Sequence, residues 1–352
     1  MTELYLTEYF LTTAFKDFHH LWCISSASLS LTPLSAECFL GYRGAASYKT
    51  RMNTQVAQQG RVLDVSRRYV TLFSRDHGVV TGRVSSKALE LVTGDLVTYE
   101  LRDGEVFVTG VEPSTHNLYR SYRGTVKKMG ANIDLLFVIS AVGQVLNPVI
   151  IDRMLVAAKI QGIHSVLVVN KSDLGAAALS PLTDVYRSIG SEVLCLSAKF
   201  LENFDELKKL IDAPSVRVAA LCGVSGVGKS TILNRLVPDA GARTGEVSQR
   251  TGQGKQTTTQ PRGFLYGPGE EKIIIDFPGV QFFGLSHETR ESVVAAFPEF
   301  VAASTGCRFG DCKHLQEPEC AVRRGLEEGT IAPWRYDSYL QILQEIEDAR
   351  EY

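Results

Sequence analysis

Apolar residues along this chain fall into short runs, and the length and spacing of the runs predict its secondary structure. From about residue 60 the runs are brief, β-rich and separated by polar or glycine turns. They cover residues 62–65, 69–73, 78–84, 96–101 and 105–111. Asp103 and Gly104 join the last two runs and form a two-residue hairpin signal. Five short strands within about fifty residues predict a small closed barrel, of the OB or the SH3 type.

Longer apolar runs follow, and they predict the strands of a buried parallel sheet. These runs cover residues 134–140, 165–169, 192–196, 216–222 and 272–276. After the first of them, Asn147 and Pro148 supply an N-cap and a first-turn proline, and Gly162 is the expected terminator. The residues at helical spacing between them should face the sheet; they are Ile151, Met154, Leu155 and Ala158. Together these elements predict an α/β domain.

The two ends of the chain give different signals. Residues 1–52 lack the basic start and unbroken apolar core of a signal peptide. We expect a mobile extension, or a start codon placed too early; a binding arm that folds on its partner is the alternative. At the other end, helical periodicity returns in a segment expected to pack on the cysteines described below. Its apolar positions are Tyr336, Tyr339, Leu340, Leu343 and Ile346.

Composition narrows the class of protein. A chain of 352 residues suggests two or three domains, and 37 basic against 39 acidic residues give no overall charge for binding nucleic acid. A local patch would be needed, and the predicted barrel offers one, although ordinary solvated side chains would look the same. Its residues are Arg61, Arg67, Arg68, Arg75, Arg83 and Lys87. No apolar run reaches the 18 residues of a membrane span, and seven cysteines clustered late favour a reducing, cytoplasmic setting.

One motif organises the rest of the chain. It matches G-x-x-x-x-G-K-[ST] without a mismatch, between an apolar strand and a helical segment at 231–236. In that setting backbone N–H groups surround a β-phosphate at a helix N-terminus, Lys229 faces the β- and γ-oxygens, and Ser230 ligates Mg²⁺. The sequence therefore predicts a nucleoside triphosphate site. Its residues are Gly223, Val224, Ser225, Gly226, Val227, Gly228, Lys229, Ser230 and Thr231.

Two further motifs identify the base. The quartet Asn170, Lys171, Ser172 and Asp173 ends a predicted strand, where the Asp173 carboxylate can accept from guanine N1–H and N2–H₂ together. Adenine offers a lone pair at N1, so it would leave the carboxylate unpaired. The Asn170 side chain is expected to address the N7 and O6 side, and the Lys171 stem to pack on the base. A second loop, predicted to face guanine O6 with a backbone N–H, contains Ser197, Ala198 and Lys199.

Two candidate switches come after the phosphate loop. Asp276 ends a strand in the sequence Asp-Phe-Pro-Gly, where it can hold Mg²⁺ while Gly279 offers its N–H to the γ-phosphate. A polar loop at 254–259 contains three threonines, of which Thr258 is the expected magnesium ligand. Ordinary GTPases run from the phosphate loop through the switches to the base motifs. Here the base motifs come first, so the domain is predicted to be circularly permuted.

A cysteine- and histidine-rich segment follows the nucleotide motifs. Four soft ligands lie within fourteen residues: Cys307, Cys312, His314 and Cys320. Three thiolates and one imidazole suit tetrahedral Zn²⁺, and they leave no open position for catalysis. We expect one structural zinc that stabilises a small C-terminal unit.

The order of barrel, permuted GTPase and zinc unit resembles the RsgA/YjeQ family, the GTPases that depend on the small ribosomal subunit. The resemblance spans residues 60–348 and includes Ala131 to Asp134 and Ile151 to Arg153. It implies an OB barrel at 56–113, a permuted GTPase at 114–286 and a helical zinc domain at 287–352, after an extension at 1–55. It also implies a monomer that binds the 30S subunit and 16S rRNA, assists late subunit maturation, and hydrolyses GTP to GDP in a step linked to release.

One residue departs from the family pattern. The first switch of the family reads Gly-Arg-His-Thr-Thr, and Gln256 stands here in place of the histidine implicated in hydrolysis. Gln256 could orient a water but cannot act as a base, and Val280 occupies the position of the Ras-type glutamine. Three hypotheses remain open: a GTPase stimulated by the 30S subunit, with Gln256 as its tentative hydrolytic residue; a GTP-gated RNA-binding factor with vestigial hydrolysis; and an ATPase.

Overall fold

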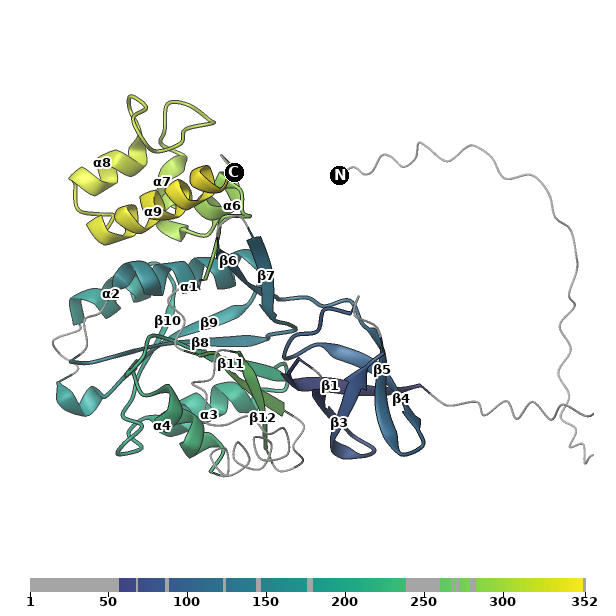
Figure 1. The fold of residues 1–352 in the computed structure, drawn as a ribbon. Helices are drawn as coiled ribbons and strands as arrows, with labels where there is room; N and C mark the ends of the chain where they lie inside the picture. Colours follow the sequence, from purple (N-terminus) through teal and green to yellow (C-terminus); the bar gives the residue numbers. More distant parts are fainter. Residues whose placement is uncertain are drawn as a thin grey trace, which may run out of the picture. The chain divides into compact units, whose positions relative to one another are not determined.

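The computed structural model describes most of the chain after residue 56. The described residues are 57–67, 69–85, 89–122, 125–143, 147–175, 180–238, 260–267, 269, 272–278 and 283–350. They belong to a compact unit that begins at Thr54 (Figure 1). The extension predicted for residues 1–55 therefore lies outside the described residues, as do Gln256, Thr258 and Gly279.

The predicted barrel is present, and it closes in the order β1-β2-β3-β5-β4. Its strands are β1 (Gln58–Val65), β2 (Val70–Ser74), β3 (Gly78–Val84), β4 (Leu96–Arg102) and β5 (Glu105–Val111). β3 pairs with β5 in parallel, while β1 closes the barrel against β4 in the antiparallel sense. This order is that of the OB type. Asp103 and Gly104 have φ angles of 52° and 81°, as the predicted two-residue hairpin requires.

A two-stranded ribbon that the sequence pattern did not predict follows the barrel. It consists of β6 (Leu118–Tyr122) and β7 (Thr125–Gly130). Leu118 is buried, whereas Arg120, Val126 and Lys127 are exposed. The ribbon is anchored at its base, because Lys128 donates to the buried Asp95 carboxylate of the barrel at 2.8 Å.

The five longer apolar runs form five strands of a six-stranded sheet, in the order β10-β9-β8-β11-β13-β12, and β12 was not predicted from the sequence. All neighbouring strands are parallel except β12 and β13. The strands are β8 (Leu135–Ala141), β9 (His164–Asn170), β10 (Glu192–Cys195), β11 (Val218–Cys222), β12 (Arg262–Tyr266) and β13 (Lys272–Asp276). Every residue of β8 and β11 is buried, which explains their unbroken apolar sequence.

Helices cover both faces of this sheet (Figure 1). One face carries α1 (Pro148–Ile160) and α2 (Ser180–Ser188), and the other carries α3 (Phe204–Asp212) and α4 (Lys229–Leu236). A short 3₁₀ turn, η1 (Ser172–Leu174), follows β9. The predicted start of α1 is confirmed, because the Asn147 side chain accepts from Val149 N at 3.1 Å. The four residues expected to face the sheet are all buried.

Four helices form the C-terminal part of the chain. They are α6 (Arg290–Ala295), α7 (Pro298–Ser304), α8 (Ala321–Glu327) and α9 (Pro333–Arg350). Tyr339, Leu343 and Ile346 of α9 are buried as predicted, but Leu340 is 36% exposed, so its assignment to the packed face was wrong. The α9 helix also packs along α1, so this module shares a hydrophobic core with the sheet.

A buried ionic cluster ties the two parts together. The Arg335 guanidinium of α9 donates to Asp152 of α1 at 2.6 Å and to Glu299 of α7 at 2.6 Å. The Asp152 carboxylate also accepts from Tyr186 and Ser338, each at 2.6 Å.

Among the described residues, no helix has the length and apolar character needed to cross a membrane.

Candidate functional site

The predicted nucleotide motifs meet at one edge of the sheet. The quartet follows β9, the Ser197 loop follows β10, the phosphate loop follows β11 and Asp276 ends β13. These four strands are parallel, so their carboxyl ends lie at the same edge. Ligands of open α/β sheets bind at this edge.

The phosphate loop is closed on itself through its lysine. Lys229 begins α4, and its Nζ donates to the carbonyl oxygens of Gly223 at 2.7 Å and Val224 at 3.1 Å. Burial lowers the pKa of Lys229, and the charge of Asp276 opposes that shift. Ser225, Gly226, Ser230 and Thr231 are exposed around it, which leaves them accessible to a ligand at the N-terminus of α4.

Asn170 joins the base motifs to the phosphate loop. Its side chain is 3% exposed; the Nδ2 donates to Val227 O at 2.9 Å, and the Oδ1 accepts from Ala198 N at 3.0 Å. One amide therefore holds three loops in register. The sequence interpretation placed this side chain on the N7 and O6 side of guanine, which stays a prediction. The structure shows its oxygen and one of its two amide hydrogens connecting the loops.

The glycine at the end of the phosphate loop makes this arrangement possible. Gly228 has a φ of 97°, and a Cβ there would overlap the Asn170 Nδ2. A residue with a side chain would therefore be strained in its backbone and would also displace Asn170. This glycine is required by the neighbouring base motif as well as by the phosphates.

A network of side chains also fixes the base loops. The Ser197 hydroxyl donates to the Asp173 carboxylate at 2.6 Å, and the Ser172 hydroxyl donates to Glu202 at 3.1 Å. Asp173 remains exposed. Lys171 has a φ of 60°, and Lys199 lies with its Nζ 4.8 Å from the centre of the Phe200 ring. Glu202 was not predicted from the sequence, because nothing in its spacing marks it.

Asp276 carries the clearest sign of a missing partner. Its Oδ1 is buried and accepts no hydrogen bond from the described residues. Burial raises the pKa of this carboxyl to about 6, although the Lys229 ammonium lowers it. A buried carboxylate oxygen beside the phosphate loop fits a magnesium ion, which prefers oxygen ligands. Of the other two expected magnesium ligands, Ser230 is exposed at the start of α4, and Thr258 lies outside the described residues, so its role stays a prediction.

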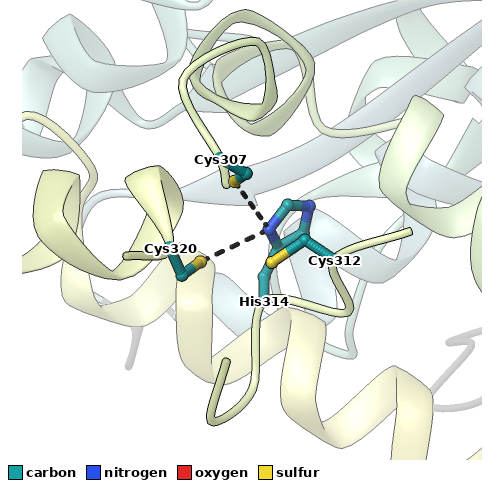
Figure 2. A group of neighbouring side chains, drawn as sticks. All are labelled: Cys307, Cys312, His314 and Cys320. Carbon is teal, nitrogen blue, oxygen red and sulfur yellow. Dashed lines mark hydrogen bonds between the residues drawn. The ribbon is translucent and has the colours of Figure 1, made fainter. Parts of the chain in front are cut away.

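The four soft ligands of the C-terminal module also come together (Figure 2). Their ligand atoms all lie within 4.8 Å of one another. His314 Nδ1 is 3.7 Å from the Cys307 sulfur and 3.5 Å from the Cys320 sulfur. Zinc–sulfur and zinc–nitrogen bonds of about 2.3 and 2.0 Å in a tetrahedron place these atoms about 3.5 Å apart. The cluster therefore has the spacing of a four-coordinate metal site.

Surrounding residues hold these ligands in place. Ser304 Oγ lies 3.1 Å from His314 Nε2, which leaves Nδ1 facing the sulfurs, and Tyr336 donates to His314 O at 2.6 Å. The Glu317 carboxylate accepts three backbone N–H groups of the ligand loop, and these bonds lower its pKa to about 2 despite partial burial. Burial lowers the pKa of His314, which favours the neutral imidazole that a metal binds.

This chain is similar in sequence to known GTPases. The model of the family described as RsgA GTPase matches residues 111–286. A Pseudomonas putida protein, "Small ribosomal subunit biogenesis GTPase RsgA", is 39% identical over 259 residues, which is 72% of this chain and 74% of that protein. A Haemophilus influenzae protein of the same name is 36% identical over 270 residues, covering 74% of this chain and 77% of the relative.

The chain belongs to the RsgA GTPase family. It is therefore a GTPase, and its base motifs precede its phosphate loop in the chain, which is the circularly permuted order. The crystal structure of YjeQ from Thermotoga maritima matches with a TM-score of 0.64 at 25% identity, covering 83% of this chain and 99% of that one. The crystal structure of YloQ, a circularly permuted GTPase, matches with a TM-score of 0.60 at 22% identity, covering 86% and 98%.

The barrel, the permuted sheet and the Cys/His module are therefore the three parts that the sequence resemblance implied.

One residue of the basic face expected on the barrel is not part of that face. Arg61 is half-buried and donates to Gly94 O at 2.9 Å, so it contributes to packing rather than to the surface. Arg67, Arg75 and Arg83 are exposed, whereas Arg68 and Lys87 lie outside the described residues.

Proposed function

We propose that this RsgA-family GTPase acts in assembly of the small ribosomal subunit, binding the 30S particle through 16S rRNA and leaving it after GTP hydrolysis. The observation that carries the ribosomal part is the family relationship, since its relatives bear the name small ribosomal subunit biogenesis GTPase. A role in assembling a ribosomal subunit would place the protein in the cytoplasm. The cysteines within the described residues form no disulfide, which is compatible with that setting.

Guanine recognition is assigned to the quartet and the Ser197 loop. Asp173 would accept from guanine N1–H and N2–H₂, with Ser197 holding the carboxylate by its 2.6 Å hydrogen bond. The stems of Lys171 and Lys199 would cover the base, and the N–H of Lys199 has no partner among the described residues and is available to guanine O6. Asn170 keeps these loops at a fixed distance from the phosphate loop.

Phosphate binding is assigned to the loop from Gly223 to Thr231. Lys229 would exchange its bonds to Gly223 and Val224 carbonyls for phosphate oxygens, which are charged and therefore stronger acceptors. Ser230, Asp276 and Thr258 would hold Mg²⁺, which neutralises charge on the transferring phosphoryl group when bound. Chemistry of this kind depends on positioning and charge more than on a strong base.

We assign zinc to the site formed by Cys307, Cys312, His314 and Cys320. Burial and the neighbouring thiols raise the pKa of Cys312 to about 12, so the metal-free thiol is neutral and metal binding releases its proton. Four protein ligands close the coordination sphere, which makes the site structural.

Contact with rRNA is assigned in part to the barrel. Arg67, Arg75 and Arg83 are exposed there, and the Arg83 guanidinium lies 5.9 Å from the ring centre of Tyr69, which is 38% exposed. An exposed aromatic ring beside arginines can stack on bases and pair with phosphates.

A second candidate function follows from the residue expected to position the attacking water. Gln256 stands where the family has histidine, which favours a second candidate function, a GTP-gated RNA-binding factor with vestigial hydrolysis. Gln256→His tests it in an assay with 30S subunits. A gain of more than about tenfold in turnover would support the vestigial enzyme; an unchanged rate would identify Gln256 as a working substitute.

The main proposal is tested by phosphate release with and without purified 30S subunits. We expect stimulation of at least about a hundredfold, since groups supplied in trans raise GTPase rates by that order or more. Isolated 50S subunits serve as the control. Equal rates with 30S, with 50S and with neither would contradict a ribosomal role and leave the GTPase itself intact.

A further inference from the structure

The Glu345 carboxylate, in the C-terminal helix α9, bonds to three separate parts of the chain. Glu345 of α9 accepts from the backbone N–H of Leu285 at 2.9 Å and from the Ser121 hydroxyl of β6 at 2.9 Å. Its other oxygen pairs with the Arg153 guanidinium of α1. The Glu345 side chain is 26% exposed and that of Arg153 is 18% exposed, so the pair is largely shielded from water.

Glu345 binds a short segment, residues 283–285, whose side chains and backbone are closely packed. Phe283 and Leu285 are 1% and 2% exposed, and Arg153 also donates to Phe283 O at 3.4 Å. Between them, a Cβ at Gly284 would overlap the backbone and side chain of Ser121. The backbone of this segment therefore cannot shift without moving β6, α1 or α9.

Phe283 connects this segment to the nucleotide edge of the sheet. Its ring lies 6.2 Å, centre to centre, from the ring of Phe277, the residue that follows Asp276. Phe277 is fully buried, and its ring lies so close to Gly130 at the end of β7 that a Cβ there would be 2.7 Å from Phe277 Cζ. Packing this dense transmits displacement, because neither ring has free space to absorb it.

We propose that Glu345 is a positioning residue for GTP hydrolysis: through Leu285, Phe283 and Phe277 it fixes Asp276, the carboxylate assigned to magnesium. The partners of Glu345 are Ser121, Leu285 and Arg153, and Glu345 belongs to a helix outside the nucleotide motifs. The inference rests on the proposed magnesium role of Asp276. Under this proposal the C-terminal module affects GTP hydrolysis through the packing that leads to Asp276.

The test is Glu345→Gln in the full chain, with GTP turnover measured against Mg²⁺ concentration. The amide keeps the size of the side chain but loses the charge that pairs with Arg153. We expect the Mg²⁺ concentration for half-maximal turnover to rise at least fivefold, with the affinity for a fluorescent GDP in EDTA unchanged within twofold. Glu347→Gln, an exposed position on the same helix, should match the wild type in every measurement.

A merely structural role predicts another result. If Glu345 only stabilises the C-terminal module, the variant melts at a lower temperature while its Mg²⁺ requirement stays that of the wild type, and the inference is overturned. Should Glu345→Gln fail to fold, Ser121→Ala decides, since it removes one hydrogen bond to the same carboxylate and should raise the Mg²⁺ requirement about twofold. A wild type whose turnover ignored Mg²⁺ would overturn the Asp276 assignment, and the inference with it.

Discussion

At the scale of single residues, Asn170 shows that a sequence motif can mark a residue without revealing which groups it contacts. The N-K-x-D pattern marked the residue as part of a guanine site. Its bonds to Val227 O and Ala198 N depend on how close β9, β10 and β11 bring three loops, which no local pattern encodes. For the same reason the need for Gly228 beside Asn170 could not be derived from the phosphate-loop motif alone.

Gly228→Ala should abolish nucleotide binding, because the added Cβ overlaps the Asn170 amide and the φ of 97° is unfavourable for alanine. Gly267→Ala is the matched control: its φ is 96°, and a Cβ there meets nothing within 4 Å. We expect the control to lose about 1–2 kcal/mol of unfolding free energy and keep its affinity for fluorescent GDP. Equal losses of affinity in both variants would mean that backbone strain, not the Asn170 contact, is responsible.

We expect the magnesium requirement to depend on pH through Asp276, if this carboxylate binds Mg²⁺ as proposed. Burial raises its pKa to about 6 in the metal-free protein, so below that pH the carboxyl is neutral and Mg²⁺ must displace a proton. The half-saturating Mg²⁺ concentration should be constant above about pH 6.5 and rise towards tenfold per pH unit below the pKa. Titration of turnover with Mg²⁺ from pH 5 to 8 measures it, after correction for Mg²⁺ binding to free GTP. A flat profile would contradict the assignment.

At the scale of elements, periodicity and capping predicted much of the described fold. The barrel strands, the buried strands and the start of α1 at Asn147 followed from local signals. The β6–β7 ribbon was not predicted, because its strands are largely polar and contain no apolar run. The helices α6 to α8 were not predicted because they are shorter than the window of about 11 residues over which helical periodicity is distinct. Leu340 lies in a helix that was predicted correctly, but its own burial was not. Periodicity predicted the helix, whereas the packing of α9 against α1 determines which of its residues are buried.

Ser304→Ala should lower the zinc affinity of the C-terminal module about tenfold, because the Ser304 hydroxyl orients His314 through Nε2. Thr305→Ala is the control, since the Thr305 hydroxyl donates to Ala302 O and contacts no ligand. Competition with a chromophoric chelator gives both affinities. An affinity in Ser304→Ala equal to that of the control would show that the ring is held by its surroundings alone.

At the scale of the whole molecule, the order of the motifs predicted the permutation, but no sequence pattern indicated how the modules are joined. Asp152 and Arg335 lie 183 positions apart, and their contact is buried on both sides. Pairs so distant in the chain leave no trace in local periodicity. The family resemblance included Asp152 without indicating its partner.

Arg335→Ala should cost about 3–5 kcal/mol of unfolding free energy, because it leaves the buried carboxylates of Asp152 and Glu299 without their cation. Arg308→Ala, which breaks the exposed pair with Glu319, should cost less than about 1 kcal/mol. Urea unfolding of the two variants compares them directly. Similar small losses would mean that the cluster does not hold α9 to the nucleotide domain.

The central claim is that segments in permuted order assemble one guanine-nucleotide site. Turnover of GTP and of xanthosine triphosphate by Asp173→Asn tests it most directly. The amide can accept from xanthine N1–H and donate to xanthine O2, whereas its N–H₂ group would face the N2–H₂ donor of guanine. We predict that the variant loses most GTP turnover and gains turnover of xanthosine triphosphate. Unchanged preference for GTP, or efficient use of ATP by the wild type, would contradict the account.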